Sequence, residues 1–87
     1  MASYKLSSSE KSILRELIFP ESFENIASGT GFPYGVIRDD LIQLMNHGFI
    51  EVAGGIETGN KPYFDSDQIH LFSYKATGLG LKQIEHQ

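Results

Sequence analysis

The chain has 87 residues, of which 40% are hydrophobic and 21% charged, with a formal net charge of −4 and no cysteine. This length allows one modest core, so we expect residues 1–87 to form a single domain, and the lack of cysteine excludes disulfides and thiolate metal sites. No stretch approaches the roughly 20 apolar residues that span a bilayer, and the N-terminal residues lack the apolar core of a signal peptide, so we expect no membrane partner and a cytoplasmic protein.

The first predicted element is a helix near residues 8–18. Ser7 and Glu10 have the spacing of a capping box, in which each side chain accepts a hydrogen bond from the backbone N–H of the other residue. Pro20 ends the helix, because the residue before a proline is disfavoured in the helical region. The apolar stripe at helical spacing consists of Ile13, Leu14, Leu17 and Ile18.

A second, short helix is expected near residues 22–28, with Ser22 as its N-cap. Either Gly29 or Gly31 can end it in the left-handed conformation that glycine adopts without strain. The residues expected to point inward are Phe23, Ile26 and Ala27.

A third helix is predicted near residues 33–47, where Pro33 suits the first helical turn. On a helical wheel one side of this helix is apolar, and Leu41 stands at its centre, so we expect Leu41 to be fully buried. The cluster consists of Ile37, Leu41 and Leu44, with Tyr34 and Met45 flanking it.

The second half of the chain predicts two strands, near 49–53 and 70–76, and a C-terminal helix near 78–85. In the return strand Phe72, Tyr74 and Ala76 share a face, and in the last helix Leu81 and Ile84 are expected to point inward. The long connection between the strands contains Thr-Gly-Asn-Lys at residues 58–61, a sequence typical of a tight hairpin turn.

This order of elements resembles the winged helix-turn-helix superfamily over nearly the whole chain. The resemblance is carried by ENIASGTGFPYGVIRDDLIQLMNHGFIEV at residues 24–52 and YKATGLGLKQIE at residues 74–85, where Ala76 occupies a position that is commonly Leu. It implies an α+β fold with a three-helix core, a two- to three-stranded wing and a short C-terminal helix. It also implies transcriptional regulation, with the third helix in the major groove of DNA.

Charge argues against a simple DNA-reading surface. From Phe19 to Glu57 the only Lys or Arg is Arg38, against six acidic residues, whereas nucleic-acid domains usually carry basic residues on the recognition element. Two features favour an anion: the third helix starts without a capping side chain, and Lys61 lies near the expected wing tip. The residues that we select as contacts for DNA or a protein partner are Pro33, Tyr34, Gly35, Val36, Arg38, Asp39, Ile42, Gln43, Asn46 and Lys61.

The remaining histidines, aspartates and serines fit structural roles better than catalytic or metal-binding ones. The spacings of His47, His70 and His86 match no metal pattern, and the Asp-Ser-Asp at residues 65–67 falls far short of the six to eight oxygens that Ca²⁺ takes. The serines near the first helix have no histidine in an obvious catalytic arrangement, and Thr-Gly-Leu-Gly at residues 77–80 lacks the lysine of a phosphate loop. We therefore predict no catalytic residues, no cofactor and no bound metal.

Two functions remain open from the sequence. The first is a small winged-helix regulator that binds double-stranded DNA, expected as a homodimer because one module makes few contacts. The second is an acidic protein-interaction module that shares the winged-helix core, supported by the acidic middle of the chain and by Val36 and Ile42, which the helical wheel places on the outward face.

Overall fold

The computed structural model describes residues 4–55 and 66–85, which form an α+β arrangement with four α-helices and a small three-stranded antiparallel sheet. The arrangement is compatible with the expected winged helix. In chain order the elements are α1 (Ser8–Glu16), β1 (Glu21–Ser22), α2 (Phe23–Thr30), α3 (Tyr34–Asn46), β2 (Ile50–Gly55), the 3-10 helix η1 (Ser66–Leu71), β3 (Phe72–Ala76) and α4 (Gly78–Glu85).

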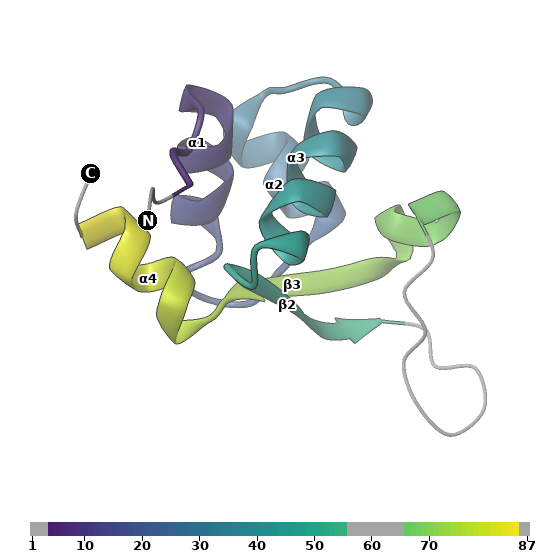
Figure 1. Ribbon diagram of the computed structural model, residues 1–87. Helices are drawn as coiled ribbons and strands as arrows, with labels where there is room; N and C mark the ends of the chain where they lie inside the picture. Colours follow the sequence, from purple (N-terminus) through teal and green to yellow (C-terminus); the bar gives the residue numbers. More distant parts are fainter. Residues whose placement is uncertain (1–3, 56–65, 86–87) are drawn as a thin grey trace.

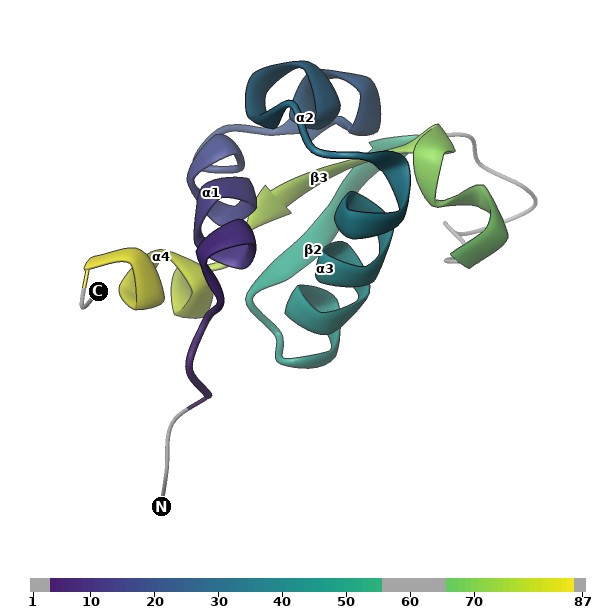
Figure 2. The ribbon, with the colours of Figure 1, turned by 90° about the horizontal axis from the view of Figure 1, so that it is seen from above.

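Helices α1, α2 and α3 cover one face of the sheet (Figure 1). Helix α4 lies beside α1 at one end of the sheet, and η1 lies beside α3 at the other end. Seen from above, α1 and α3 run along the sheet while α2 lies across one end of both (Figure 2). No helix within the described residues is both long enough and apolar enough to cross a membrane.

The sheet has the order β1-β3-β2, so β3 is its central strand. Its first strand was not predicted: Glu21 and Ser22 pair with Tyr74 and Ser73 of β3, and a two-residue strand is too short to leave a period in the sequence. The ladder between β2 and β3 shifts at Ala53, because Val52 faces Tyr74 whereas Gly54 faces Ser73. This extra residue is a β-bulge.

The start of α1 forms as predicted. The Ser7 hydroxyl accepts from the Glu10 backbone N–H, and the Glu10 carboxylate accepts from the Ser7 N–H at 2.8 Å, which completes a capping box. The end differs, because α1 stops at Glu16 and the chain turns before Pro20. Ile18 therefore lies beyond the helix and is exposed, so its predicted place in the apolar stripe is wrong.

Helices α2 and α3 follow the predicted pattern closely. Ser22 caps α2 by accepting from the Asn25 N–H at 3.1 Å, and Gly31 ends it with φ of 73°. Of the two glycines considered, Gly31 is thus the one in the left-handed region. Leu41 of α3 is completely buried, as the wheel predicted.

The core lies between the three helices and the inner face of β3. That face carries Phe72, Tyr74 and Ala76, which share a face as predicted and are all buried. Tyr74 is fully buried, and its O–H donates to the backbone carbonyl of Ile69 at 2.8 Å, while burial raises the pKa of its phenol. The apolar side chains that complete the core are Leu6, Ile13, Leu14, Leu17, Phe23, Ile26, Ile37, Leu41, Leu44, Phe49, Ile50 and Ile69.

Residues 66–71 were expected to lead into or belong to the return strand, but they form η1, and β3 begins only at Phe72. The buried Ile69 side chain holds η1 against α2 and α3. The predicted turn at 58–61 lies outside the described residues.

Helix α4 packs against the domain through Gly80 instead of through the predicted Leu81. Leu81 is exposed, contrary to prediction, and Ile84 is half-buried against the core. Gly80 is the buried residue of α4, and its Cα lies against the backbone carbonyl of Phe49. The Thr77 hydroxyl anchors the helix start by donating to the Gly48 carbonyl at 2.6 Å.

The contact between α1 and α3 contains two carboxyl groups. Glu10 is buried and accepts from the Tyr4 hydroxyl at 2.7 Å, and this hydrogen bond, together with burial and the charges of Glu10 and Asp40, raises the pKa of Tyr4 to about 12. Asp40 of α3 is half-buried on the same side, and its Oδ2 atom has no hydrogen-bond partner among residues 4–55 and 66–85. Burial raises the pKa of Asp40 above 3.8, the charges of Glu10 and Asp39 add to this, and a hydrogen bond from Ser9 opposes it.

The complete burial of Leu41 predicts that Leu41→Ala lowers the free energy of unfolding by roughly 2–5 kcal/mol, since it leaves a cavity where the helices meet. The control is Gln43→Ala, an exposed position on the same helix where the change should stay within about 0.5 kcal/mol. Urea denaturation measures both. Equal midpoints for the two variants would show that α3 is oriented differently.

Gly80→Ala should destabilise the protein by roughly 1–3 kcal/mol although alanine favours helices, because the added methyl group meets the Phe49 carbonyl. Gly78→Ala in the same helix is the matched control, since a methyl group there meets nothing within 4 Å. Thermal unfolding followed by circular dichroism compares the pair. A Gly80→Ala melting temperature equal to that of Gly78→Ala would contradict the packing of α4.

Asp40→Asn should raise stability at neutral pH. The folded protein holds the Asp40 proton more tightly than the unfolded chain, because the folded-state pKa of Asp40 is raised. The folding stability that comes with the neutral carboxyl group is therefore complete below about pH 3.8, and it is lost as pH rises through the folded-state pKa. The gain from Asn should therefore be present at pH 7 and vanish as pH falls toward 3.8. Urea midpoints across this range, with the exposed Asp39→Asn as control, measure it; a gain that grows at acid pH has the wrong sign.

Candidate interaction surface

The first turn of α3 starts without a side-chain cap, as the sequence predicted. Pro33 is the N-cap residue, with φ of −64° and ψ of 156°, and it supplies no side-chain cap. The first hydrogen bond of the helix runs from the Ile37 N–H to the Pro33 carbonyl at 3.1 Å. The N–H groups before Ile37 thus have no partner within the helix, and the positive end of the helix dipole faces the same way.

One side of α3 faces η1. Tyr34, Arg38 and Ile42 recur every four residues and so form one line along the helix. At the N-terminal end of this line, the centroid of the Tyr34 ring lies 5.0 Å from that of Phe23 and 6.2 Å from that of His70 in η1. Tyr34 remains 46% exposed, so its ring is held by two neighbours and still presents an apolar edge to solvent.

Arg38, the one basic residue of α3, has an acidic neighbour. Its guanidinium Nη2 atom lies 3.1 Å from Oδ1 of Asp39, and Nε lies 3.2 Å from the same oxygen. Both side chains are exposed, at 44% and 67%, so the pair contributes little to stability. Its effect is on recognition, because the one basic side chain of α3 already has an acidic partner.

The outward line of α3 is neutral or acidic. Val36, Asp39, Gln43 and Asn46 follow one another at helical spacing, and all four are exposed. Gly35, beside them, is half-buried, and a side chain there would meet nothing within 4 Å. Among these groups the amides of Gln43 and Asn46 are the only side-chain donors.

Two residues of α3 turn away from the exposed face. Ile42 is half-buried and packs against the core, so it is not the exposed contact that the wheel indicated. Asp40, one of the acidic residues in the middle of the chain, turns toward Ser9 and Glu10 of the α1 region. Lys61 lies outside the described residues.

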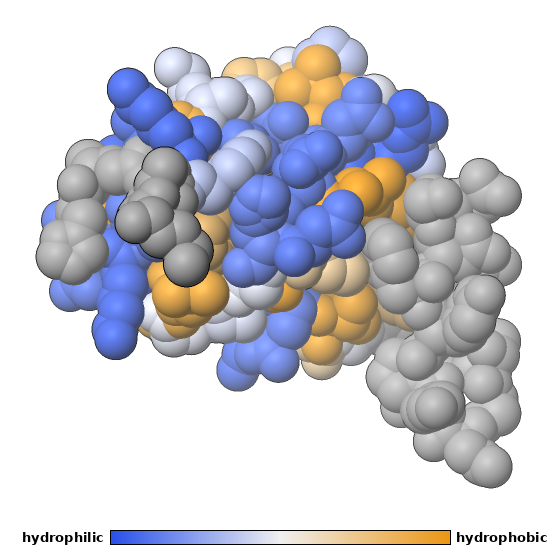
Figure 3. All heavy atoms as spheres, viewed as in Figure 1, coloured by the Kyte–Doolittle hydropathy of each residue, from blue (hydrophilic) through white to orange (hydrophobic). Residues whose placement is uncertain are grey.

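The structure adds η1 to the surface, which the sequence did not suggest. Leu71 is 38% exposed, and His70 is exposed beside Tyr34. In Figure 3 apolar colour gathers along the edge of α3 nearest η1 and over β2 below it, while hydrophilic colour covers the middle of the face. We call the α3 surface the exposed or half-exposed set Pro33, Tyr34, Gly35, Val36, Arg38, Asp39, Gln43, Asn46, His70 and Leu71.

The described residues offer no metal centre, because residues 4–55 and 66–85 bring no three of His, Asp and Glu together around a common point. His47 is the C-cap of α3, where a cation suits the helix dipole. Its ring packs edge-on against Tyr4 at 3.8 Å and lies 5.7 Å from the ring of Phe49. These contacts agree with a structural role for this histidine.

Comparisons with protein-family models, with curated proteins and with solved structures find no match for this chain.

Proposed function

We propose that this chain is a small winged-helix protein whose α3 surface binds another protein. The element order helix, strand, helix, helix, strand, strand, helix supports the winged-helix assignment, as does the packing of α1, α2 and α3 over one face of the sheet. The observation that carries the functional proposal is the Arg38–Asp39 ion pair. It places a carboxylate beside the one basic side chain of α3, whereas a DNA-reading helix needs cations for phosphates and guanine edges.

The α3 surface has the features of a protein contact of moderate size. Tyr34 and Leu71 provide apolar and aromatic area near one end, and Val36 adds a third exposed apolar side chain. Interface cores are enriched in such aromatic residues and depleted in charge. Asp39 offsets the charge of Arg38 on this surface, so the partner expected here makes a mainly apolar contact with polar groups around it.

A DNA-binding transcriptional regulator is the second candidate. It is favoured by the uncapped start of α3, whose free N–H groups suit a phosphate, and by the resemblance of residues 24–52 to the recognition region of such regulators. A homodimer is part of this candidate because Arg38 and Lys61 of one chain neutralise few phosphates. Under both candidates we propose a cytoplasmic, non-enzymatic protein that needs no cofactor.

Duplex DNA binding, measured by fluorescence anisotropy across a salt series, separates the two candidates. We expect weak binding, with log K falling against log salt at a slope no steeper than about −3, since each neutralised phosphate contributes about −0.9. Asp39→Lys should strengthen binding and steepen the slope, because it adds a cation and also releases Arg38. Sub-micromolar, sequence-specific binding by a monomer that Arg38→Ala abolishes would favour the regulator and reject the protein-contact proposal.

The protein contact is tested with Val36→Asp, which adds a charge to an exposed side chain without touching the core. Quantitative affinity capture should lose one set of partners relative to the wild-type chain. Ile18→Asp is the matched control, because Ile18 is an exposed aliphatic residue outside the α3 surface. Loss of the same partners from both variants, or from neither, would contradict binding through α3.

A further inference from the structure

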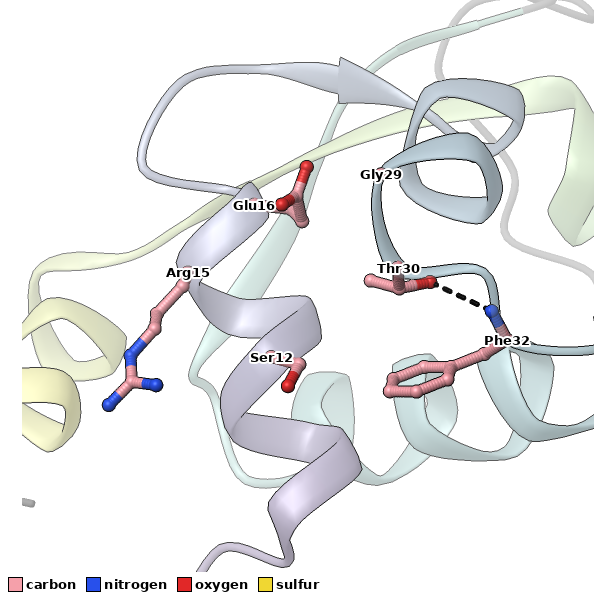
Figure 4. Close-up of a pocket in the computed structure, with 6 residues that line it drawn as sticks. All are labelled: Ser12, Arg15, Glu16, Gly29, Thr30 and Phe32. Carbon is pink, nitrogen blue, oxygen red and sulfur yellow. Dashed lines mark hydrogen bonds between the residues drawn. The ribbon is translucent and has the colours of Figure 1, made fainter.

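A cleft between α1 and the C-terminal end of α2 lies outside the α3 surface. It has a volume of about 360 Å³, within the lower range of ligand sites. Its lining residues are Ser12, Arg15, Glu16, Gly29, Thr30 and Phe32. Figure 4 shows Ser12 and Glu16 on the side of α1 that faces Thr30 and Phe32, while Arg15 points away toward α4.

Glu16 lies against the last turn of α2. A side chain at Gly29 would overlap the Glu16 carboxylate, so glycine at this position leaves the space that the carboxylate occupies. Glu16 is half-buried, and within residues 4–55 and 66–85 it has no ion-pair or hydrogen-bond partner. Arg15, the neighbouring cation, is directed out of the cleft (Figure 4). The cleft therefore contains a negative charge that the described chain does not neutralise.

The end of α2 adds to this negative potential. The C-terminal carbonyl groups of a helix carry a partial negative charge, which a basic residue in the last turn usually offsets. Helix α2 has no basic residue in its last turn. The Thr30 hydroxyl does not offset this negative charge in the cleft, because its proton is donated to the Ile26 carbonyl within the helix at 2.8 Å. A carboxylate and a helix C-terminus thus face the same space without a cation between them.

The wall of the cleft that Phe32 forms suits both a cationic group and its apolar stem. The half-buried Phe32 ring closes the cleft opposite Ser12 (Figure 4), and the face of an aromatic ring attracts ammonium and guanidinium groups. The Ser12 hydroxyl donates to the Ser8 carbonyl at 3.2 Å, so its remaining lone pairs are acceptors. The groups available to a ligand are accordingly a carboxylate, hydroxyl acceptors and an aromatic face.

We propose that this cleft binds an ammonium or guanidinium group carried on a short apolar stem. The cation donates charge-assisted hydrogen bonds to the Glu16 carboxylate and lies at the negative end of α2, while the stem packs against Phe32. The same chemistry occurs in free alkylamines and in the lysine or arginine side chain of a partner. Because no cleft residue belongs to the α3 surface, the proposal stands apart from the function of α3.

Amide ¹H–¹⁵N NMR titrations test the proposal with n-butylammonium and methylguanidinium as probes and butan-1-ol as the neutral comparison. We expect saturable shifts at Ser12, Glu16 and residues 29–32, with roughly millimolar affinity, as suits a small ligand with few contacts. A blocked Gly-Lys-Gly peptide distinguishes the two sources. If the peptide binds about tenfold more tightly than n-butylammonium, the natural ligand is the side chain of a partner protein. If the peptide binds equally or more weakly, the natural ligand is a free amine.

The decisive variant is Glu16→Gln, which keeps the shape of the side chain and removes its charge. It should weaken both cations at least about tenfold, and it should keep the melting temperature of the wild type because Glu16 makes no described ion pair. Glu24→Gln removes the same charge from an exposed site in the first turn of α2 and should bind like wild type. Unsaturable shifts, equal shifts with butan-1-ol, or unchanged affinity in Glu16→Gln would overturn the proposal.

Discussion

The hydrogen bond from the buried Tyr74 hydroxyl to the Ile69 carbonyl is the contact on which the arrangement of this protein depends. Tyr74 is at the centre of the middle strand, where it pairs with β1 on one side and β2 on the other. Its ring fills the core beneath the helices, and its hydroxyl needs an acceptor because an unpartnered polar group inside a core is costly. The carbonyl of Ile69 meets that need, and it thereby fixes η1 against α2 and α3.

The placement of η1 determines what α3 can present. With η1 held in place, His70 and Leu71 stand next to the start of α3, and Tyr34 lies within ring-contact distance of His70. The start of α3 is therefore bordered by aromatic and aliphatic side chains as well as by free backbone donors. An acidic outward line and a paired Arg38 complete a surface that suits a protein partner better than phosphates.

Carboxyl groups recur where the helices of this protein meet. Glu10 satisfies both the helix cap and the Tyr4 hydroxyl, so its burial is compensated by hydrogen bonds. Asp40 is half-buried with one oxygen unpartnered, and Glu16 stands at the end of α2 with no neutralising cation among the described residues. These three groups show why net charge alone describes the chain poorly: each carboxylate has a different neighbour and therefore a different role.

The sequence by itself determined the local elements and most of the core. The capping box at Ser7 and the glycine stop at Gly31 are set by neighbours within a few residues, so spacing alone predicts them. The burial of Leu41 follows from its place at the centre of an apolar stripe at helical spacing. The tertiary structure decided what depends on distant partners. Strand β1 exists because Tyr74 and Ser73 lie beside it, α4 turns Gly80 inward because the Phe49 backbone approaches it, and Ile42 is half-covered by the core. Helical periodicity gives the direction of a side chain from its own axis but not what the rest of the chain places in front of it, and for that reason the cleft beside Glu16 became visible only in three dimensions.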